Sequence, residues 1–147
     1  MTLRRAEAGD AAAVRELTRL AYAKWVPLIG REPTPMQADY DETVRKHRID
    51  LLHVDGKLAA LIETIDEPDH LLVENVAVAP AFQRRGLGRQ LMAHAERLAA
   101  SLGYREIRLY TNKLFAENVE LYRALGYRVD REETIPAGTV VHMSKPC

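Results

Sequence analysis

The sequence predicts an α+β fold in which helices flank a mixed, mostly antiparallel sheet. Segments whose apolar residues recur at helical spacing alternate with short apolar segments typical of strands. The pair Asp55-Gly56 separates two of the strand-like segments and is typical of the tight turn of an antiparallel hairpin. In the second half, strands alternate with helices, and helices that cross over a sheet join parallel strands.

The composition narrows the functional classes. The 147 residues suit one domain spanning residues 1–147, and a hydrophobic share of 47% can bury a core. Basic and acidic residues number 21 each, which argues against a nucleic-acid partner and is compatible with a homodimer. The single cysteine, Cys147, predicts a reducing compartment. Without an apolar leader in Met1–Asp10 or a run of ~20 apolar residues, we expect a cytoplasmic protein that has no membrane partner.

The first third is predicted to contain one strand and two helices. Residues 2–6 form the strand, and Asp10 is a suitable N-cap for an amphipathic helix that ends near Trp25. Three prolines and a glycine predict a loop over residues 27–35. A second helix is predicted over residues 36–47.

The remaining elements begin with the hairpin around Asp55-Gly56. The strand over residues 71–79 is largely apolar, so we expect it to be buried on both faces. The other predicted elements are, in order, strands 51–54 and 57–65, helix 86–102 ending at Gly103, strand 105–110, helix 116–125 ending at Gly126, and strands 127–130 and 139–144.

A glycine-containing turn joins strand 71–79 to the next helix. The N-terminus of a helix carries unpaired N–H groups and partial positive charge, and Gly86 and Gly88 let the backbone approach an anion. Three arginines at positions 84, 85 and 89 add positive charge, so the turn predicts a phosphate or pyrophosphate site. The alternative is a tight turn with solvated arginines. Leu91 occupies the place of the third glycine of a dinucleotide fingerprint, and no P-loop run is present.

Residues 83–88, Gln-Arg-Arg-Gly-Leu-Gly, resemble the Q/R-x-x-G-x-G/A signature of the GCN5-related N-acetyltransferase (GNAT) superfamily. Residues 118–127 resemble its Asn-x-x-x-Tyr-x-x-x-Gly-aromatic segment, and Leu3–Ala6 resembles its start. The resemblance covers nearly the whole chain and is weakest from Trp25 to Arg48. It implies a twisted sheet of about six to seven strands, about four helices and a splayed central strand pair.

The same resemblance implies an enzyme that transfers the acetyl group of acetyl-CoA to a primary amine of a small molecule or peptide, by direct attack on the thioester. The strand backbone would pair with the pantetheine arm, and one strand N–H would polarise the thioester carbonyl. The implied coenzyme A contacts are Val76, Ala77, Val78, Gln83, Arg84, Arg85, Gly86, Leu87, Gly88, Arg89 and Asn118. A non-catalytic acyl-CoA-binding regulatory module of the same fold is the alternative.

Tyr122 is the candidate general acid. It follows Asn118 by four residues, so both lie on one face of a helix, and it matches the acid tyrosine of the superfamily. Its proton would go to the leaving thiolate of coenzyme A. The alternative is an aromatic ring packed beside Leu121 and Leu125.

Glu74 is the candidate general base. It interrupts an apolar strand, where burial of a carboxylate without a partner is costly. The resemblance implies that it accepts a proton from the amine, directly or through water. The alternative is that Glu74 reaches the sheet edge or pairs with an arginine. Trp25, Tyr22, Tyr40 and residues 30–33 are candidates for lining the acceptor pocket, and the five histidines show no metal-ligand spacing, so we expect no metal.

Overall fold

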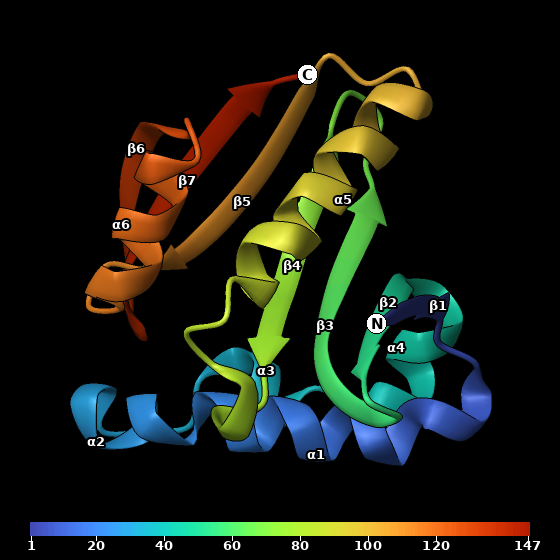
Figure 1. The fold of residues 1–147 in the computed structure, drawn as a ribbon. Helices are drawn as coiled ribbons and strands as arrows, with labels where there is room; N and C mark the ends of the chain where they lie inside the picture. The colour runs from blue at the N-terminus through green and yellow to red at the C-terminus, as the bar shows by residue number, and fades with distance from the viewer.

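The computed structural model describes residues 1–147 and contains a seven-stranded sheet flanked by helices (Figure 1). The strand order is β1-β2-β3-β4-β5-β7-β6. Neighbouring strands are antiparallel except β4 and β5, which are parallel. The predicted mixed, mostly antiparallel sheet is therefore confirmed.

The elements have the following bounds. The strands are β1 (Thr2–Arg5), β2 (Arg48–Val54), β3 (Lys57–Asp66), β4 (Leu71–Val78), β5 (Glu106–Asn112), β6 (Arg128–Ile135) and β7 (Gly138–Pro146). The helices are α1 (Ala11–Tyr22), α2 (Val26–Ile29), α3 (Thr34–Gln37), α4 (Tyr40–Lys46), α5 (Leu87–Ser101) and α6 (Ala116–Ala124). No helix combines the length and the apolar composition that crossing a membrane requires.

The segment between α1 and β2 differs from the prediction. The loop predicted over residues 27–35 overlaps the end of α2 and the start of α3. Pro27 and Pro35 lie in the first turns of these helices, where proline is tolerated. The single helix predicted for residues 36–47 is wrong, since Ala38 is extended and divides it into α3 and α4. Asp39 begins α4 by accepting hydrogen bonds from the N–H groups of Asp41 and Glu42.

Two strand predictions also need correction. β4 is not buried on both faces: its residues alternate between buried and half-buried, as in a strand with one face toward a cavity. β6 continues to Ile135, well beyond the predicted end at Asp130. All its residues are exposed at the edge of the sheet, so no apolar alternation marks its second half.

The central strands β4 and β5 diverge soon after they meet. They pair only over Leu71–Val73 and Ile107–Leu109. Beyond these residues β4 continues along β3 to Val78, while β5 continues along β7 to Asn112. The sheet thus opens as a V between the carboxyl ends of β4 and β5, as Figure 1 shows, and this is the splayed pair that the resemblance implied.

The two faces of the sheet have separate cores. One contains Leu91 and Met92 of α5 together with β-strand residues and Tyr122 and Tyr127. The other contains Val14 and Leu17 of α1, and it also includes Ala77 of β4. The first core also holds Val73 of β4 together with Leu109 of β5 and Met143 of β7, so it joins the two arms of the V on that face.

Candidate active site

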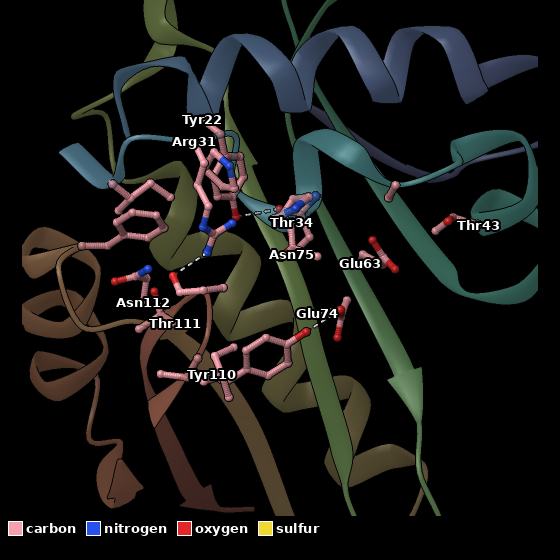
Figure 2. Close-up of a pocket in the computed structure, with 18 of the residues that line it drawn as sticks. Tyr22, Arg31, Thr34, Thr43, Glu63, Glu74, Asn75, Tyr110, Thr111 and Asn112 are labelled. Carbon is pink, nitrogen blue, oxygen red and sulfur yellow. Dashed lines mark hydrogen bonds between the residues drawn. The ribbon is translucent and has the colours of Figure 1, made fainter. Parts of the chain in front are cut away.

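Two cavities lie at the opening between β4 and β5. The first, which we call the turn cleft, encloses about 460 Å³. Its lining is Ala21, Tyr22, Lys24, Trp25, Val76, Val78, Phe82, Gln83, Arg84, Gly86, Leu87, Gly88, Arg89, Glu117, Asn118, Leu121 and Tyr122. The second, which we call the β4–β5 pocket, encloses about 250 Å³ and is drawn in Figure 2. Tyr22 lines both, so the two cavities adjoin at its side chain.

The turn before α5 leaves a row of backbone N–H groups unpaired beside the cleft. None of the N–H groups of residues 84–89 has an acceptor in the chain, and no side chain caps α5. Arg84 at φ 65° and Gly86 at φ 78° adopt left-handed conformations. Such a turn gathers N–H groups into a concave site, and the positive end of the helix dipole adds to it. The backbone alone therefore offers unpaired donors of the kind that suit an anion.

The side chains of this turn have distinct positions. Arg84 and Arg89 line the cleft, whereas Arg85 lies over the Phe82 ring, 5.2 Å from its centroid. The Gln83 amide donates to the Val78 carbonyl at 3.1 Å and so fastens the turn to the end of β4. Leu87 is 5% exposed and anchors the first turn of α5 in the core. Two of the three arginines thus add positive charge to the lining of the cleft.

The open edge of β4 forms the next part of the cleft. The Ala79 N–H donates to Ala59 of β3, and backbone groups alternate along a strand, so those of Ala77 also face β3. Those of Val76 and Val78 face the opening, where the Val76 carbonyl lies 3.4 Å from the Tyr22 hydroxyl. Val76 and Val78 line the cleft, whereas the Ala77 side chain is buried on the other face. The N–H groups of Val76 and Val78 are therefore without a strand partner.

Helix α6 forms the opposite wall of the turn cleft. Asn118 and Tyr122 both line it, one helical turn apart. The Tyr122 ring meets the Tyr127 ring edge-on at 6.0 Å, and burial raises the pKa of the Tyr122 hydroxyl to about 12. The hydroxyl therefore carries its proton at neutral pH. Trp25, expected at the acceptor pocket, instead lines the turn cleft and stacks on Phe115 at 4.4 Å.

Glu74 lies where β4 leaves β5. The pairing of β3 with β4 passes from Asn75 to Val73, so Glu74 is the extra residue of a β-bulge, a feature that redirects a side chain. Its carboxylate lines the β4–β5 pocket and accepts a 2.5 Å hydrogen bond from the Tyr110 hydroxyl of β5, as Figure 2 shows. No arginine or lysine pairs with Glu74, so the alternative in which an arginine is its partner is not what the structure shows.

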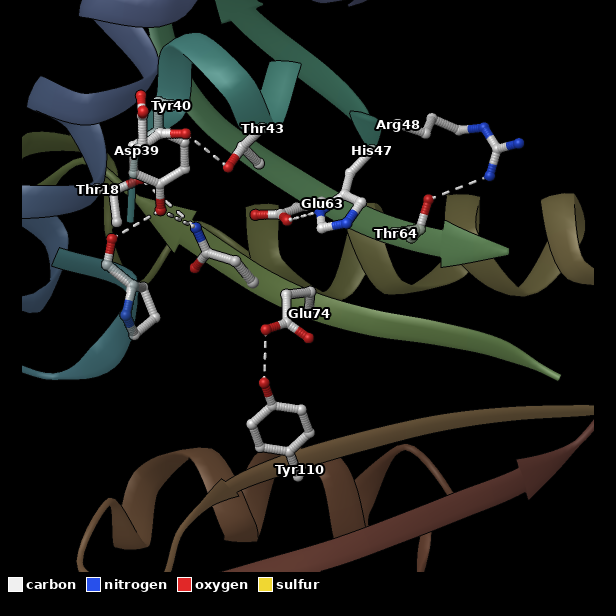
Figure 3. Close-up of polar contacts among 12 residues, drawn as sticks. Thr18, Asp39, Tyr40, Thr43, His47, Arg48, Glu63, Thr64, Glu74 and Tyr110 are labelled. Atoms are coloured by element: carbon white, nitrogen blue, oxygen red, sulfur yellow. Dashed lines mark hydrogen bonds and ion pairs between the residues drawn. The ribbon is translucent and has the colours of Figure 1, made fainter. Parts of the chain in front are cut away.

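A second carboxylate, Glu63, lines the same pocket and is paired with His47. The sequence analysis missed it. Glu63 is 4% exposed, and its Oε2 lies 2.6 Å from His47 Nδ1 (Figure 3). Burial raises the pKa of the Glu63 carboxyl, the negative charge of Glu74 acts in the same direction, and His47 opposes both. A carboxylate inside the apolar strand β3 is the same signal that selected Glu74 and could have identified Glu63.

A hydrogen-bonded group separates the two cavities. The Tyr22 hydroxyl donates to Asn75 Oδ1 at 2.8 Å, and Asn75 Nδ2 lies 3.4 Å from the Tyr40 hydroxyl. Tyr40 in turn donates to the Pro35 carbonyl at 2.7 Å. Tyr22 and Tyr40 therefore line the β4–β5 pocket as expected, and Asn75 orients them. The chain gathers no group of three or more His, Cys, Asp or Glu side chains suited to a metal ion.

A model of the acetyltransferase (GNAT) family matches residues 13–127. Among curated proteins, a 71-residue stretch is 38% identical to mouse N-alpha-acetyltransferase 80, covering 48% of this chain and 21% of that protein. A 76-residue stretch is 36% identical to the Salmonella typhimurium [ribosomal protein bS18]-alanine N-acetyltransferase, covering 52% of this chain and 51% of that protein. The matches thus span about half or less of these relatives.

Solved structures share the fold over nearly the whole chain. PaiA N-acetyltransferase from Thermoplasma acidophilum, in complex with coenzyme A, superposes with a TM-score of 0.82 at 16% identity, covering 99% of this chain and 98% of that one. The ribosomal-protein-S18-alanine N-acetyltransferase from Escherichia coli gives 0.80 at 23% identity, covering 99% and 92%. Both likenesses establish the fold.

We expect Glu63→Gln to stabilise the protein at pH 8. A raised pKa in the folded state means that folding favours the protonated carboxyl, so stability falls as pH rises through the folded pKa. Glutamine removes the free-energy cost of burying the charged carboxylate. The gain in stability over the wild type should vanish below about pH 4, where the carboxyl is protonated in the folded and unfolded states. Urea unfolding at pH 8 and below about pH 4 measures the difference in stability. Glu120→Gln, at an exposed position, is the control. A Glu63→Gln protein that is less stable at pH 8 would contradict this interpretation.

Proposed function

Because the chain belongs to the acetyltransferase (GNAT) family, we propose that residues 1–147 form one N-acetyltransferase domain, which moves the acetyl group of acetyl-CoA to a primary amine of a small molecule or peptide. One observation carries the proposal. The turn with unpaired N–H groups, the open edge of β4 and Tyr122 line a single cleft, and that cleft meets a second pocket, which contains Glu63 and Glu74, at Tyr22.

The residues of the turn cleft fit coenzyme A. Six free N–H groups with Arg84 and Arg89 suit a pyrophosphate. The unpaired edge at Val76 and Val78 suits an extended, amide-containing arm, which would pair as an added strand, and Asn118 can hydrogen-bond to the same arm. The similar Thermoplasma acidophilum structure was determined with coenzyme A, which supports this assignment. When bound, acetyl-CoA supplies a thioester, whose carbonyl carbon is an electrophile.

Glu74 and Tyr122 carry the proton transfers in this proposal. Glu74 accepts a proton from the acceptor ammonium, directly or through water, which leaves a neutral amine able to attack the thioester carbon. The Tyr110 hydroxyl donates to Oε1 of Glu74 and leaves the other carboxylate oxygen for this task. A β4 N–H polarises the carbonyl oxygen. Glu74 releases its proton to solvent. As the C–N bond forms and the C–S bond breaks, Tyr122 donates its proton to the departing thiolate, and the proton that the new amide nitrogen loses returns to the Tyr122 oxygen through water.

A thiol-release assay tests the function. Free coenzyme A should form from acetyl-CoA only when an acceptor amine is present. A protein that acetyl-CoA stabilises, but that releases no thiol with any amine of a broad panel, would be a non-catalytic acyl-CoA-binding module instead.

The turn should control coenzyme binding. Acetyl-CoA should raise the melting temperature by mass action, and Gly86→Val should diminish this rise, because valine disfavours the φ of 78° and crowds the anion site. Gly103→Val is the matched control: Gly103 has a φ of 84° at the other end of α5 and open space around it. The control should lower the melting temperature of the free protein yet keep the full shift with acetyl-CoA. Equal shifts in both variants would place the anion elsewhere.

Glu74→Gln should lower kcat at neutral pH. The variant keeps the shape of the side chain but removes the proton acceptor, so activity should partly recover at higher pH, where more of the amine is neutral. Glu106→Gln, the same change at the far end of β5, should retain the wild-type pH–rate profile. If Glu74→Gln also retains that profile, Glu74 is not the base.

Tyr122→Phe should lower kcat by ~10² to 10⁴ with little change in the KM for acetyl-CoA, because general-acid assistance acts in the transition state. Tyr127→Phe is the control: Tyr127 contacts the Tyr122 ring, but its hydroxyl hydrogen-bonds Glu96 at 3.0 Å, outside the cleft. Steady-state kinetics where chemistry limits the rate measure both. A folded Tyr122→Phe enzyme with wild-type kcat would end the assignment of Tyr122 as the acid.

A further inference from the structure

We propose that the acceptor is a small aminocarboxylate, whose carboxylate binds Arg31 while its amine lies at the acidic side of the β4–β5 pocket. The inference rests on the proposed function, because it takes this pocket as the acceptor site. It adds the chemical class of the acceptor.

Arg31 brings a positive charge without a carboxylate partner into the pocket. It follows α2, and it is the only arginine or lysine that lines the β4–β5 pocket. Its Nη1 donates to the Glu32 carbonyl at 3.1 Å and its Nη2 to the Ala137 carbonyl at 2.9 Å. Both acceptors are neutral. The adjacent carboxylate of Glu32 pairs with Arg19 at 2.7 Å instead. A guanidinium has five N–H donors, so Arg31 is oriented but keeps donors for a ligand.

Hydrogen-bond donors continue along the same side of the pocket. Asn112 Oδ1 accepts the Leu114 N–H at 2.9 Å, which leaves the Nδ2 amide as a donor, and the neighbouring Thr111 also lines the pocket. Figure 2 shows the Arg31 side chain extending toward Asn112 and Thr111. A planar, charged donor group beside an amide donor suits a carboxylate.

Carboxylates, which accept hydrogen bonds, lie on the other side of the pocket. Glu74 and Glu63 project from β4 and β3, away from Arg31 in Figure 2, and Glu63 has His47 as its partner. This side suits an ammonium group, while Arg31 repels a second one. The pocket therefore has an acidic side and a basic side, which favour a molecule with one amine and one carboxylate over a diamine.

The volume limits the size of that molecule. At about 250 Å³ the β4–β5 pocket falls below the range of pockets for drug-sized ligands, about 300–1,000 Å³. Arg31 also bridges the segment after α2 to the β6–β7 turn through Ala137, and so narrows the pocket at this side. A small linear or branched amino acid fits these limits.

The experiment compares linear ω-amino acids of increasing length with the alkylamine and the diamine of the same carbon number, using thiol release from acetyl-CoA. A tripeptide amide, which has an α-amine but no free carboxylate, is a further arm. At the best length, we expect kcat/KM for the amino acid to exceed that of its alkylamine by at least about tenfold, the size of one charge-assisted hydrogen bond.

Two variants separate the charge of Arg31 from its bridging role. Arg31→Gln removes the charge and keeps a shorter amide donor. It should lower kcat/KM for the amino acid at least about tenfold while changing kcat/KM for the alkylamine less than about twofold. Arg31→Lys keeps the charge and should retain more of the preference.

Three results would overturn the inference while leaving the proposed function intact. The first is that alkylamines or diamines react as well as amino acids at every length. The second is that the tripeptide amide reacts faster than the amino acids. The third is that Arg31→Gln lowers kcat/KM equally for all acceptor amines. Absence of thiol release with every amine would overturn the proposed function and the inference with it.

Discussion

The parallel pairing between β4 and β5 ends after three residues, and the whole site depends on this early separation. Had the pairing continued, the backbone groups of Val76 and Val78 would be occupied by β5, and no space would remain between the strands. Glu74 is the first residue beyond the paired segment and also the extra residue of the bulge against β3. The divergence and the bulge together turn its carboxylate toward Tyr110 across the gap.

The separation creates two chemically different spaces from one opening. On the α5 and α6 side, free N–H groups and arginines make the turn cleft suited to an anionic ligand. On the other side, Glu63 and Glu74 make the β4–β5 pocket suited to a cation, with Arg31 opposite. Tyr22 stands between them and is fixed by its hydrogen bond to Asn75. An exposed strand edge can pair with another chain and cause aggregation in most folds, but here helices lie on both sides of the edge and it lines a cavity.

The sequence predicts the parts of this arrangement that depend on neighbouring residues. The turn over residues 84–89 and the pair Asn118 and Tyr122 lie within single local motifs, so spacing alone places them on one face. Glu63, His47, Tyr110 and Arg31 come together through strand register and chain folding. Glu63 reaches the pocket because it pairs with Asn75 in the β3–β4 register, and Tyr110 meets Glu74 because both directly follow the last pair of β4 and β5, Val73 and Leu109. The short helices α2 and α3 were also mispredicted, because four residues are too few to show a helical repeat of apolar residues.

We propose that the opening leaves alternate N–H groups of β4 free to receive coenzyme A. Residue-resolved amide hydrogen exchange tests it most directly, because Ala77 and Ala79 on the same strand face β3 and serve as internal references. In the free protein, the amides of Val76 and Val78 should exchange faster than those of Ala77 and Ala79, and saturating coenzyme A should slow at least one of them strongly. Equal protection of all four amides in the free protein, or exchange at Val76 and Val78 that coenzyme A leaves unchanged, would contradict the account.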